Sequence, residues 1–447
     1  MRLLKDSTQS NPSTLGQNIV VEALLSAAQI PPPACVALYG AWGTGKTSVL
    51  RALASQWNSS GRGPVVWFDP WEFERSGESL PALLWTMRSA LQPQDHEKLQ
   101  RFNDLFASAL KTALSISLRL GMSAASYLAL GPAAVALSPL SSIKPEDYRE
   151  NFEVSKQAWE ESVEAISKLK SLFRALVDEA LAPYDQSARV LLVLDDLDRC
   201  LPDSAVKLIE EIKLVLCGDT ACRAIFAFGL DRALIGESIM ARYPGSRVYT
   251  GENYLEKIFD VALEVPQVPA DRVEAFIENT CGKKLDAEFH KNLDSAKVSL
   301  AEITGVLGLP VFAVPRVMKR TLNRWMLLLS SAEHRAALTK ITSPGDRRRF
   351  FCYVCGAERY RAFRDFVFTA AEDDLQCLAL LGAEDGQAPP PRLTVAASAV
   401  ASIPGFRSYA THLQLGARTA QSELTLSRDG TPRSLRDFDL LLRSAGV

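Results

Sequence analysis

The residues between positions 40 and 48 have the types and spacing of a phosphate-binding loop. The loop consists of Gly40, Ala41, Trp42, Gly43, Thr44, Gly45, Lys46 and Thr47, which fit G-x-x-x-x-G-K-[ST], and Ser48 follows it. The glycines allow backbone N–H groups to curl around a phosphate at a helix N-terminus, where the helix dipole favours negative charge. Lys46 supplies a cation for the β- and γ-phosphates, and Thr47 supplies a hydroxyl for Mg²⁺. The loop therefore predicts a site for a nucleotide and Mg²⁺.

A second group of candidate residues follows the apolar run 191–194. Asp195 ends this run, at the place where an open α/β sheet binds its ligands, so its carboxylate is a candidate to hold Mg²⁺ directly or through water. Asp196 is the candidate that orients or activates the attacking water, and the alternative is that it caps the following helix. Asp198 and Arg199 either pair with each other or take part in catalysis.

A third apolar run, residues 224–228, leads to Asp231. In ATPases with several parallel strands a polar residue at this strand tip senses the γ-phosphate, and Asp231 has that position. A turn or a helix cap is an equally good interpretation. The chain has no Asn-Lys-x-Asp motif for guanine, so we expect ATP and not GTP.

Apolar runs with β-branched residues predict the elements that position these side chains. Buried parallel strands are expected at residues 35–39, 65–69, 190–194, 224–228 and 261–265. Helical stretches such as 47–57 and 203–216 alternate with them. Strand–helix alternation predicts a doubly wound α/β domain with a parallel sheet.

At 447 residues the chain is too long for one compact core. We expect a nucleotide-binding core at residues 1–265, a helical lid at 266–335 and a C-terminal region of unknown fold and function at 336–447. The gap between the second and third strands exceeds one helix. A largely helical insertion is therefore expected at 75–185, with a long amphipathic helix at 152–180.

Composition and charge limit the possible partners. The chain is 47% hydrophobic and 23% charged, with a net charge of −2, so nucleic acid is not indicated as a partner and a DNA motor is disfavoured. Eight cysteines without a disulfide or zinc pattern, and an N-terminus without a signal-peptide run, favour a cytoplasmic location. The CxxC pair Cys352 and Cys355 is expected to be two core thiols, and the run Arg347-Arg348-Arg349 a solvated helix face.

The segment 120–143 contains no charged residue and is long enough to cross a bilayer. Its many small residues, with Pro132, Pro139 and the neighbouring Arg119, favour a packed helical hairpin over 105–143. A membrane span, in a protein that faces the cytoplasm, is the alternative.

Five separated segments, in this order, resemble motifs of the KAP family of P-loop NTPases: 39–48, 66–73, 195–200, 254–258 and 315–323. The resemblance covers roughly residues 5–335. It implies a P-loop sheet of the additional-strand type with a helical lid, and an insertion that in this family often carries membrane helices. Many bacterial members look like components of defence against phages or plasmids, and animal members are membrane scaffolds in signalling. Asp69 departs from the pattern, because Asn or another small polar residue is expected there.

The motifs and the resemblance together predict an ATP- and Mg²⁺-dependent molecular switch that acts on partner proteins in a homo-oligomer or hetero-complex. Arg316 of the lid is expected to sense the γ-phosphate. Hydrolysis is expected to be slow, because Asp196 is one methylene shorter than the Glu of fast ATPases. Arg199 and Arg232 are candidates for an arginine finger across an oligomer interface. The alternatives are a membrane-associated scaffold with incidental ATP turnover and a small-molecule phosphotransferase.

Overall fold

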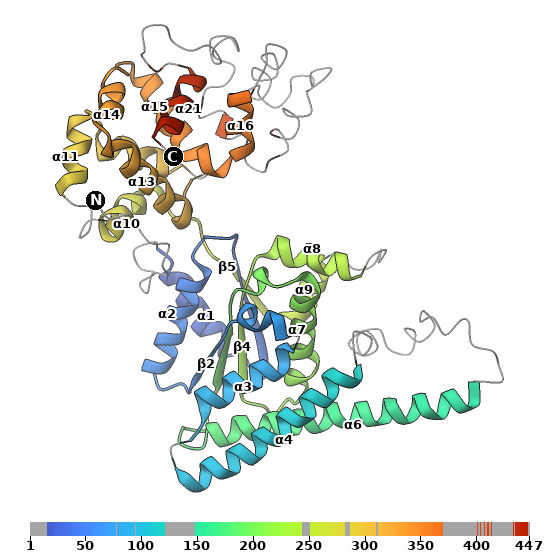
Figure 1. The fold of residues 1–447 in the computed structure, drawn as a ribbon. Coiled ribbons are helices and arrows are strands. Elements are labelled where there is room, and N and C mark those ends of the chain that lie inside the picture. The colour runs from blue at the N-terminus through green and yellow to red at the C-terminus, as the bar shows by residue number, and fades with distance from the viewer. Residues whose placement is uncertain are drawn as a thin grey trace. The chain divides into compact units, whose positions relative to one another are not determined.

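A computed structural model describes most of the chain (Figure 1). The described residues are 16–76, 78–93, 95–120, 148–243, 251–281, 287–309, 312–369, 400, 403, 406, 409–410, 413, 432 and 434–445. They divide into two compact units, of which one is Gln17–Val265 and the other contains Pro266–Val447.

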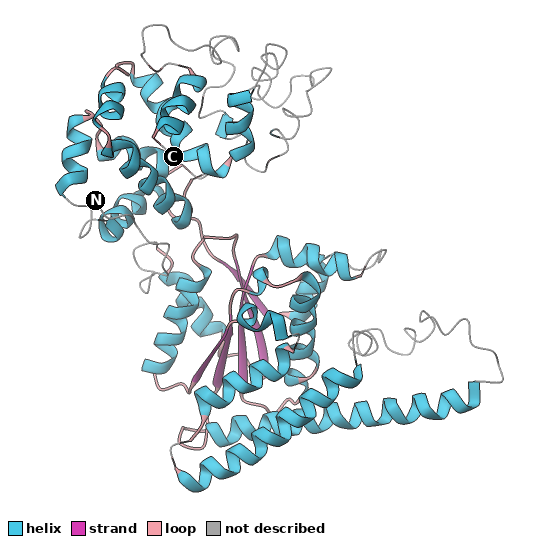
Figure 2. Cartoon of the chain, viewed as in Figure 1, coloured by secondary structure: helices cyan, strands magenta, loops and turns pink. Residues whose placement is uncertain are grey.

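The first unit is built on a five-stranded parallel sheet, surrounded by helices in Figure 2. Its strands are β1 (Ala34–Tyr39), β2 (Val65–Phe68), β3 (Val190–Leu194), β4 (Ala224–Leu230) and β5 (Val261–Glu264), in the order β2-β3-β4-β1-β5. β1, β3 and β4 are buried at every position, as strands covered on both faces are. Because β4 lies between β1 and β3, the predicted additional-strand α/β fold is confirmed.

Successive residues of the central strands point to opposite faces of the sheet. Val36 and Leu38 pack with α1 (Asn18–Ala27) and α2 (Lys46–Ser59), whereas Cys35 and Ala37 belong to the core on the other face. The helices of that other core are α3 (Ser79–Leu91), α4 (His96–Leu120), α6 (Tyr148–Ala180), α7 (Pro202–Leu214), α8 (Arg232–Arg242) and α9 (Gly251–Ile258). Apolar cores on both faces fix the sheet, so the loops that follow the strands start from fixed positions.

The predicted insertion is helical where the structure describes it. α3, α4 and α6 fall within residues 75–185, and α4 and α6 lie side by side, with Phe106 and Phe173 in one core (Figure 1). Residues 121–147, which include most of the predicted hairpin, lie outside the described residues. Among the helices that are described, none combines the length and the apolar character needed to cross a membrane.

The second unit is helical throughout its described elements. These are α10 (Ala270–Cys281), α11 (Ala287–Ser295), α12 (Leu300–Leu307), α13 (Pro315–Ser330), α14 (Ala332–Thr339), α15 (Pro344–Arg359), α16 (Arg361–Thr369) and α21 (Leu435–Ser444). One apolar core contains Trp325 of α13, Phe350 of α15 and Phe438 of α21. Helices on both sides of position 335 therefore share a core, and the expected boundary there stays a prediction.

Two side-chain expectations fall in this unit. Cys352 and Cys355 are buried free thiols of the core, as predicted. The prediction of a solvated arginine face is wrong for Arg349, which is 1% exposed. Its Nε donates to the Leu413 carbonyl at 2.8 Å and its Nη1 lies 3.8 Å from Asp346, so a distant backbone acceptor and a carboxylate compensate the buried guanidinium.

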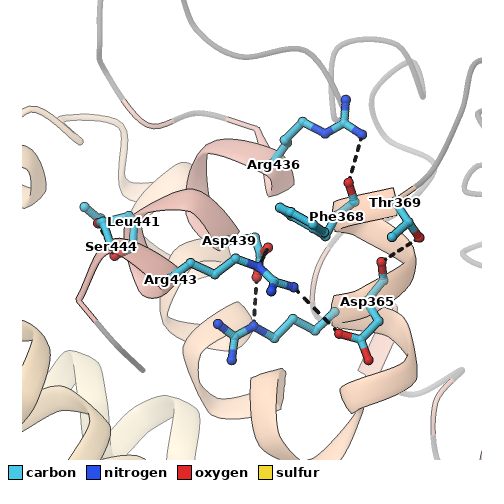
Figure 3. A network of polar contacts seen from close by, with 9 residues as sticks. Asp365, Phe368, Thr369, Arg436, Asp439, Leu441, Arg443 and Ser444 are labelled. Atoms are coloured by element: carbon cyan, nitrogen blue, oxygen red, sulfur yellow. Dashed lines mark hydrogen bonds and ion pairs between the residues drawn. The ribbon is translucent and has the colours of Figure 1, made fainter.

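Ion pairs hold the C-terminal helix α21 in this unit (Figure 3). Asp439, 1% exposed, accepts hydrogen bonds from Arg364 Nε at 2.8 Å and Arg443 Nε at 2.6 Å. The Arg443 guanidinium lies 4.0 Å from the centre of the Phe368 ring, and its Nη2 is 3.7 Å from Asp365. A buried carboxylate with two charged donors is well compensated, so these contacts stabilise the unit's fold.

Candidate functional site

The predicted P-loop connects β1 to α2, and its shape depends on glycine. Gly43 and Gly45 have φ of 88° and 109°, which other residues rarely adopt. A Cβ on Gly40 would lie 2.6 Å from Thr44 Oγ1. The loop backbone therefore forms a cradle that larger residues would fill, as a phosphate site requires.

The side chains of the loop differ widely in exposure. Thr44 Oγ1 donates to the Ala41 carbonyl at 2.8 Å and closes the turn. Trp42 is 58% exposed, whereas Lys46 and Ser48 are each 7% exposed. Lys46 Nζ donates to the Gly40 carbonyl at 2.8 Å, so the ammonium lies against the backbone at the start of the loop.

Gln17, which no motif in the sequence indicates, contacts the backbone of the P-loop. Its side chain is fully buried, and Nε2 donates to the Thr44 carbonyl at 3.0 Å. A Cβ on Gly45 would be 3.1 Å from Gln17 Oε1, an oxygen without a hydrogen-bond partner among the described residues. No pattern in the sequence distinguishes Gln17 from the other polar residues in and next to α1, whose N-cap it is.

Asp195 lies at the end of β3, where its backbone N–H donates to the Phe68 carbonyl at 3.2 Å. The side chain is 2% exposed. Burial raises the pKa of Asp195 to about 6, although a hydrogen bond from Thr47 lowers it. A Cβ on Gly229 of β4 would be 2.8 Å from Asp195 Oδ1, so glycine leaves room for the carboxylate.

The donor set at Asp195 and Thr47 fits Mg²⁺. Both offer hard oxygen ligands, and Asp195 Oδ1 is buried without a hydrogen-bond partner in the described part of the chain. Within those same residues no group of three His, Cys, Asp or Glu side chains could hold a metal. Phosphate and water would complete such a site, which is how Mg²⁺ usually binds beside nucleotides.

Asp195 and the five residues that follow it, 195–200, form a segment that we call the acidic loop, with η5 (Leu197–Arg199) at its centre. Asp196 has φ of 58°, and its Oδ1 lies 2.9 Å from Arg199 Nη2. Arg199 also lies over the Trp71 ring, with its Cζ 5.4 Å from the ring centre. The candidate for the catalytic base is therefore paired with a candidate arginine of its own loop.

Two alternative interpretations of the acidic loop are wrong. Asp196 does not cap the following helix, because α7 starts at Pro202 and Leu201 is its N-cap. Asp198 does not pair with Arg199 but with Lys46, at 3.0 Å between Oδ2 and Nζ. Neighbouring residues on a 3₁₀ turn point in different directions, so Arg199 faces Asp196 while Asp198 faces the P-loop.

Asp69 adds another carboxylate to this edge of the sheet. It follows β2, whose Phe68 is in register with Leu194 of β3, so Asp69 is the neighbour of Asp195 across the strands. Its pKa is raised by burial and by the charge of Asp196. The sequence signal was the acid at a position where Asn is expected.

The remaining predicted site residues have other contacts. Asp231 Oδ1 accepts from Ala233 N at 3.1 Å and Leu234 N at 3.4 Å, so it caps α8. Its role as a γ-phosphate sensor stays a prediction. Arg232 Nη2 lies 3.5 Å from Glu252 of the same chain.

Arg316 belongs to α13 in the second unit, within a helix that begins with Pro315. The γ-phosphate contact expected of it stays a prediction.

Comparison with known proteins gives one family match. The sequence profile of the KAP family P-loop domain matches residues 19–332. None of the curated proteins compared with the chain matches it.

Solved structures show weak similarity. Cdc6p from Pyrobaculum aerophilum is 12% identical over 98% of this chain and 96% of that chain, with a TM-score of 0.40. The Aeropyrum pernix ORC2 protein is 11% identical over 99% and 96%, with a TM-score of 0.35. A chain of Drosophila ORC bound to DNA is 11% identical over 97% and 89%, with a TM-score of 0.37.

Proposed function

Because the chain belongs to the KAP family of P-loop domains, and so binds a nucleotide, we propose that it is a slow Mg²⁺-dependent ATPase that acts as a switch on partner proteins. One observation carries this proposal. The glycine cradle and the buried Asp195 carboxylate meet at Thr47, whose side chain lies close enough to that carboxylate to lower its pKa. A phosphate cradle beside a hydroxyl and a carboxylate is the combination that ATP and Mg²⁺ need.

Each side chain has a separate part in this proposal. The backbone of residues 40–48 binds the phosphates, and Lys46 neutralises their charge. Thr47 and Asp195 hold Mg²⁺, which when bound would neutralise developing charge on the phosphate oxygens. Gly229 leaves room for the Asp195 carboxylate, and burial of Asp195, which is 2% exposed, restricts its movement.

Hydrolysis requires the Asp196 carboxylate to orient water. The 2.9 Å pair with Arg199 must open before this carboxylate can orient water, and slow turnover is proposed from the short Asp196 side chain. Arg199 is then available to stabilise charge on the transferred phosphoryl group. Arg232, which contacts Glu252 of its own chain, is the second candidate for this role across an oligomer interface.

The switch itself is proposed to be closure of the second unit over the nucleotide, with Arg316 sensing the γ-phosphate. ATP would then present one surface to partner proteins and ADP another. This part rests on the family and on the position of Arg316 in α13.

The test is nucleotide binding and phosphate release by the purified full chain and by Lys46→Ala. We expect no detectable binding or turnover in this variant, with an unchanged circular dichroism spectrum at 25 °C and a lower Tm, because Asp198 loses its counter-ion. Lys111→Ala, an exposed lysine of α4, is the matched control and is expected to behave as wild type. ATPase activity that survives Lys46→Ala contradicts the proposed site.

The setting that we propose, anti-phage defence, is supported by the resemblance to bacterial family members. Cells that express the chain are challenged with phages, beside cells that express Lys46→Ala. Protection that depends on Lys46 is the expected result, and equal plaque counts across a broad phage panel contradict it.

A further inference from the structure

Asp198 has a contact with the P-loop that its position in the sequence does not suggest. Its Oδ2 lies 3.0 Å from Lys46 Nζ, although the two residues are 152 positions apart. The Lys46 side chain is 7% exposed and that of Asp198 is 3% exposed. The pair is thus a buried link between the two halves of the nucleotide site.

We propose that Asp198 is a positioning residue. Its carboxylate pairs with Lys46 as a nucleotide phosphate would, and it must release Lys46 when a nucleotide binds. The inference rests on the proposed ATP site. An ammonium has three hydrogen-bond donors, and here two of them are used by the Gly40 carbonyl and Asp198. A phosphate that needs Lys46 therefore competes with an anion of the protein itself.

The carboxylate of Asp198 depends on this lysine. Lys46 is its one hydrogen-bonding partner among the described residues, and Oδ1 is buried without any. A buried charge that loses its counter-ion is strongly destabilised. Asp198 must consequently move, or share the lysine, once Lys46 turns to a phosphate.

Asp198 lies in a short turn whose first residue, Leu197, is buried in the core, so the release of Lys46 involves movement of the Asp198 side chain. η5 has only three residues and lies between Asp196, with its left-handed φ of 58°, and the extended Cys200. η5 also carries Arg199, which pairs with Asp196 and lies over the half-exposed Trp71. A movement of Asp198 that releases Lys46 would thus also shift Arg199, and with it the contacts of Arg199 with the candidate catalytic base Asp196 and with Trp71 at the surface.

The sign of one substitution separates this role from a merely structural one. If Asp198 only supports Lys46, its removal disorders the lysine and weakens nucleotide binding. If Asp198 competes with the phosphate, its removal strengthens binding. An affinity gain of about tenfold corresponds to a lysine that is paired nine-tenths of the time in the free protein.

The experiment is titration of a fluorescent ADP into the full chain, so that hydrolysis does not interfere. Asp198→Asn is expected to lower Kd about tenfold, and Asp198→Glu, which keeps the charge, is expected to remain near wild type. Asp203→Asn removes a carboxylate that is 51% exposed and pairs with Arg242, and it is expected to leave Kd unchanged.

The outcomes distinguish this inference from the proposed function. Unchanged or weaker binding by Asp198→Asn, together with loss of binding in Lys46→Ala, overturns the inference and leaves the ATP site standing. Wild-type binding by Lys46→Ala overturns the site itself. If Asp198→Asn does not fold, Asp198→Ser, which leaves room for water, replaces it in the titration. A lower Kd then supports the inference, and an unchanged or higher Kd overturns it.

Discussion

The P-loop and the acidic loop face each other across the site but are held in different ways. The P-loop is shaped by backbone geometry, with positive φ at Gly43 and Gly45 and a hydrogen bond from Gln17. The acidic loop is shaped by charge, through the pairs of Asp198 with Lys46 and of Asp196 with Arg199. Backbone geometry does not change when a phosphate arrives, whereas ion pairs can exchange partners with it. The site therefore combines a fixed backbone cradle, in the P-loop, with ion pairs in the acidic loop that can rearrange.

The largest expected effect is on ATP turnover, and it comes from a substitution in the acidic loop. Asp196→Asn should retain affinity for ATP with Mg²⁺ and lose turnover by about 10²-fold or more, because an amide cannot accept the proton of the attacking water. Asp195→Asn should instead weaken the dependence on Mg²⁺, since the buried carboxylate is the proposed ligand. Nucleotide titration and phosphate release measure the two properties, and equal loss of binding in both variants contradicts this division.

Replacement of Gly45 tests the fixed cradle. Alanine at φ of 109° is strained by about 1–3 kcal/mol, and its Cβ would lie 3.1 Å from Gln17 Oε1. We expect nucleotide affinity to fall about tenfold or more. Gly61→Ala is the matched control, because Gly61 also has a positive φ, of 67°, but nothing lies within 4 Å of its Cβ. It should lower stability slightly and leave affinity unchanged.

The same contrast explains what could be read from the sequence. The P-loop was predicted because its pattern is local: glycines, a lysine and a hydroxyl between a strand and a helix. Asp195 was placed correctly at the end of β3 because an apolar run of that length ends at the sheet edge. The strand order was predicted only by the family resemblance, since no local pattern specifies which strands pair.

The pairings of the acidic loop could not be predicted. Adjacent charges suggest a local pair, yet Asp198 reaches Lys46, 152 residues away, because η5 turns it inward. Gln17 and Arg349 show the same limit: each is buried against a backbone carbonyl of a distant segment. Periodicity identifies elements, but it does not tell which polar side chain finds such an acceptor.

Gln17→Ala should have a moderate effect on the fixed cradle. It removes the hydrogen bond to the Thr44 carbonyl, and one such bond is worth about 0.5–1.5 kcal/mol, so affinity should fall about two- to tenfold. Gln29→Ala, an exposed glutamine after α1, is the control. If Gln17→Ala lowers the Tm and leaves nucleotide affinity unchanged, Gln17 supports the fold and not the loop.

The smallest effect concerns the pair of Asp196 and Arg199, whose side chains are 20% and 36% exposed. Solvent screens such a pair, so the coupling between Asp196→Ala and Arg199→Ala in urea unfolding should be about 0.2–1 kcal/mol and should shrink in high salt. The pair of Arg174 and Asp178 on α6, 45% and 41% exposed, gives a control cycle of similar size with no site nearby. Loss of the other contacts of Asp196 cancels in the cycle, because it occurs in the single variant as well as in the double variant.

A coupling of several kcal/mol that does not respond to salt would show that the acidic loop is as fixed as the P-loop. A small coupling means that Arg199 leaves the carboxylate at little cost when a phosphate competes for it.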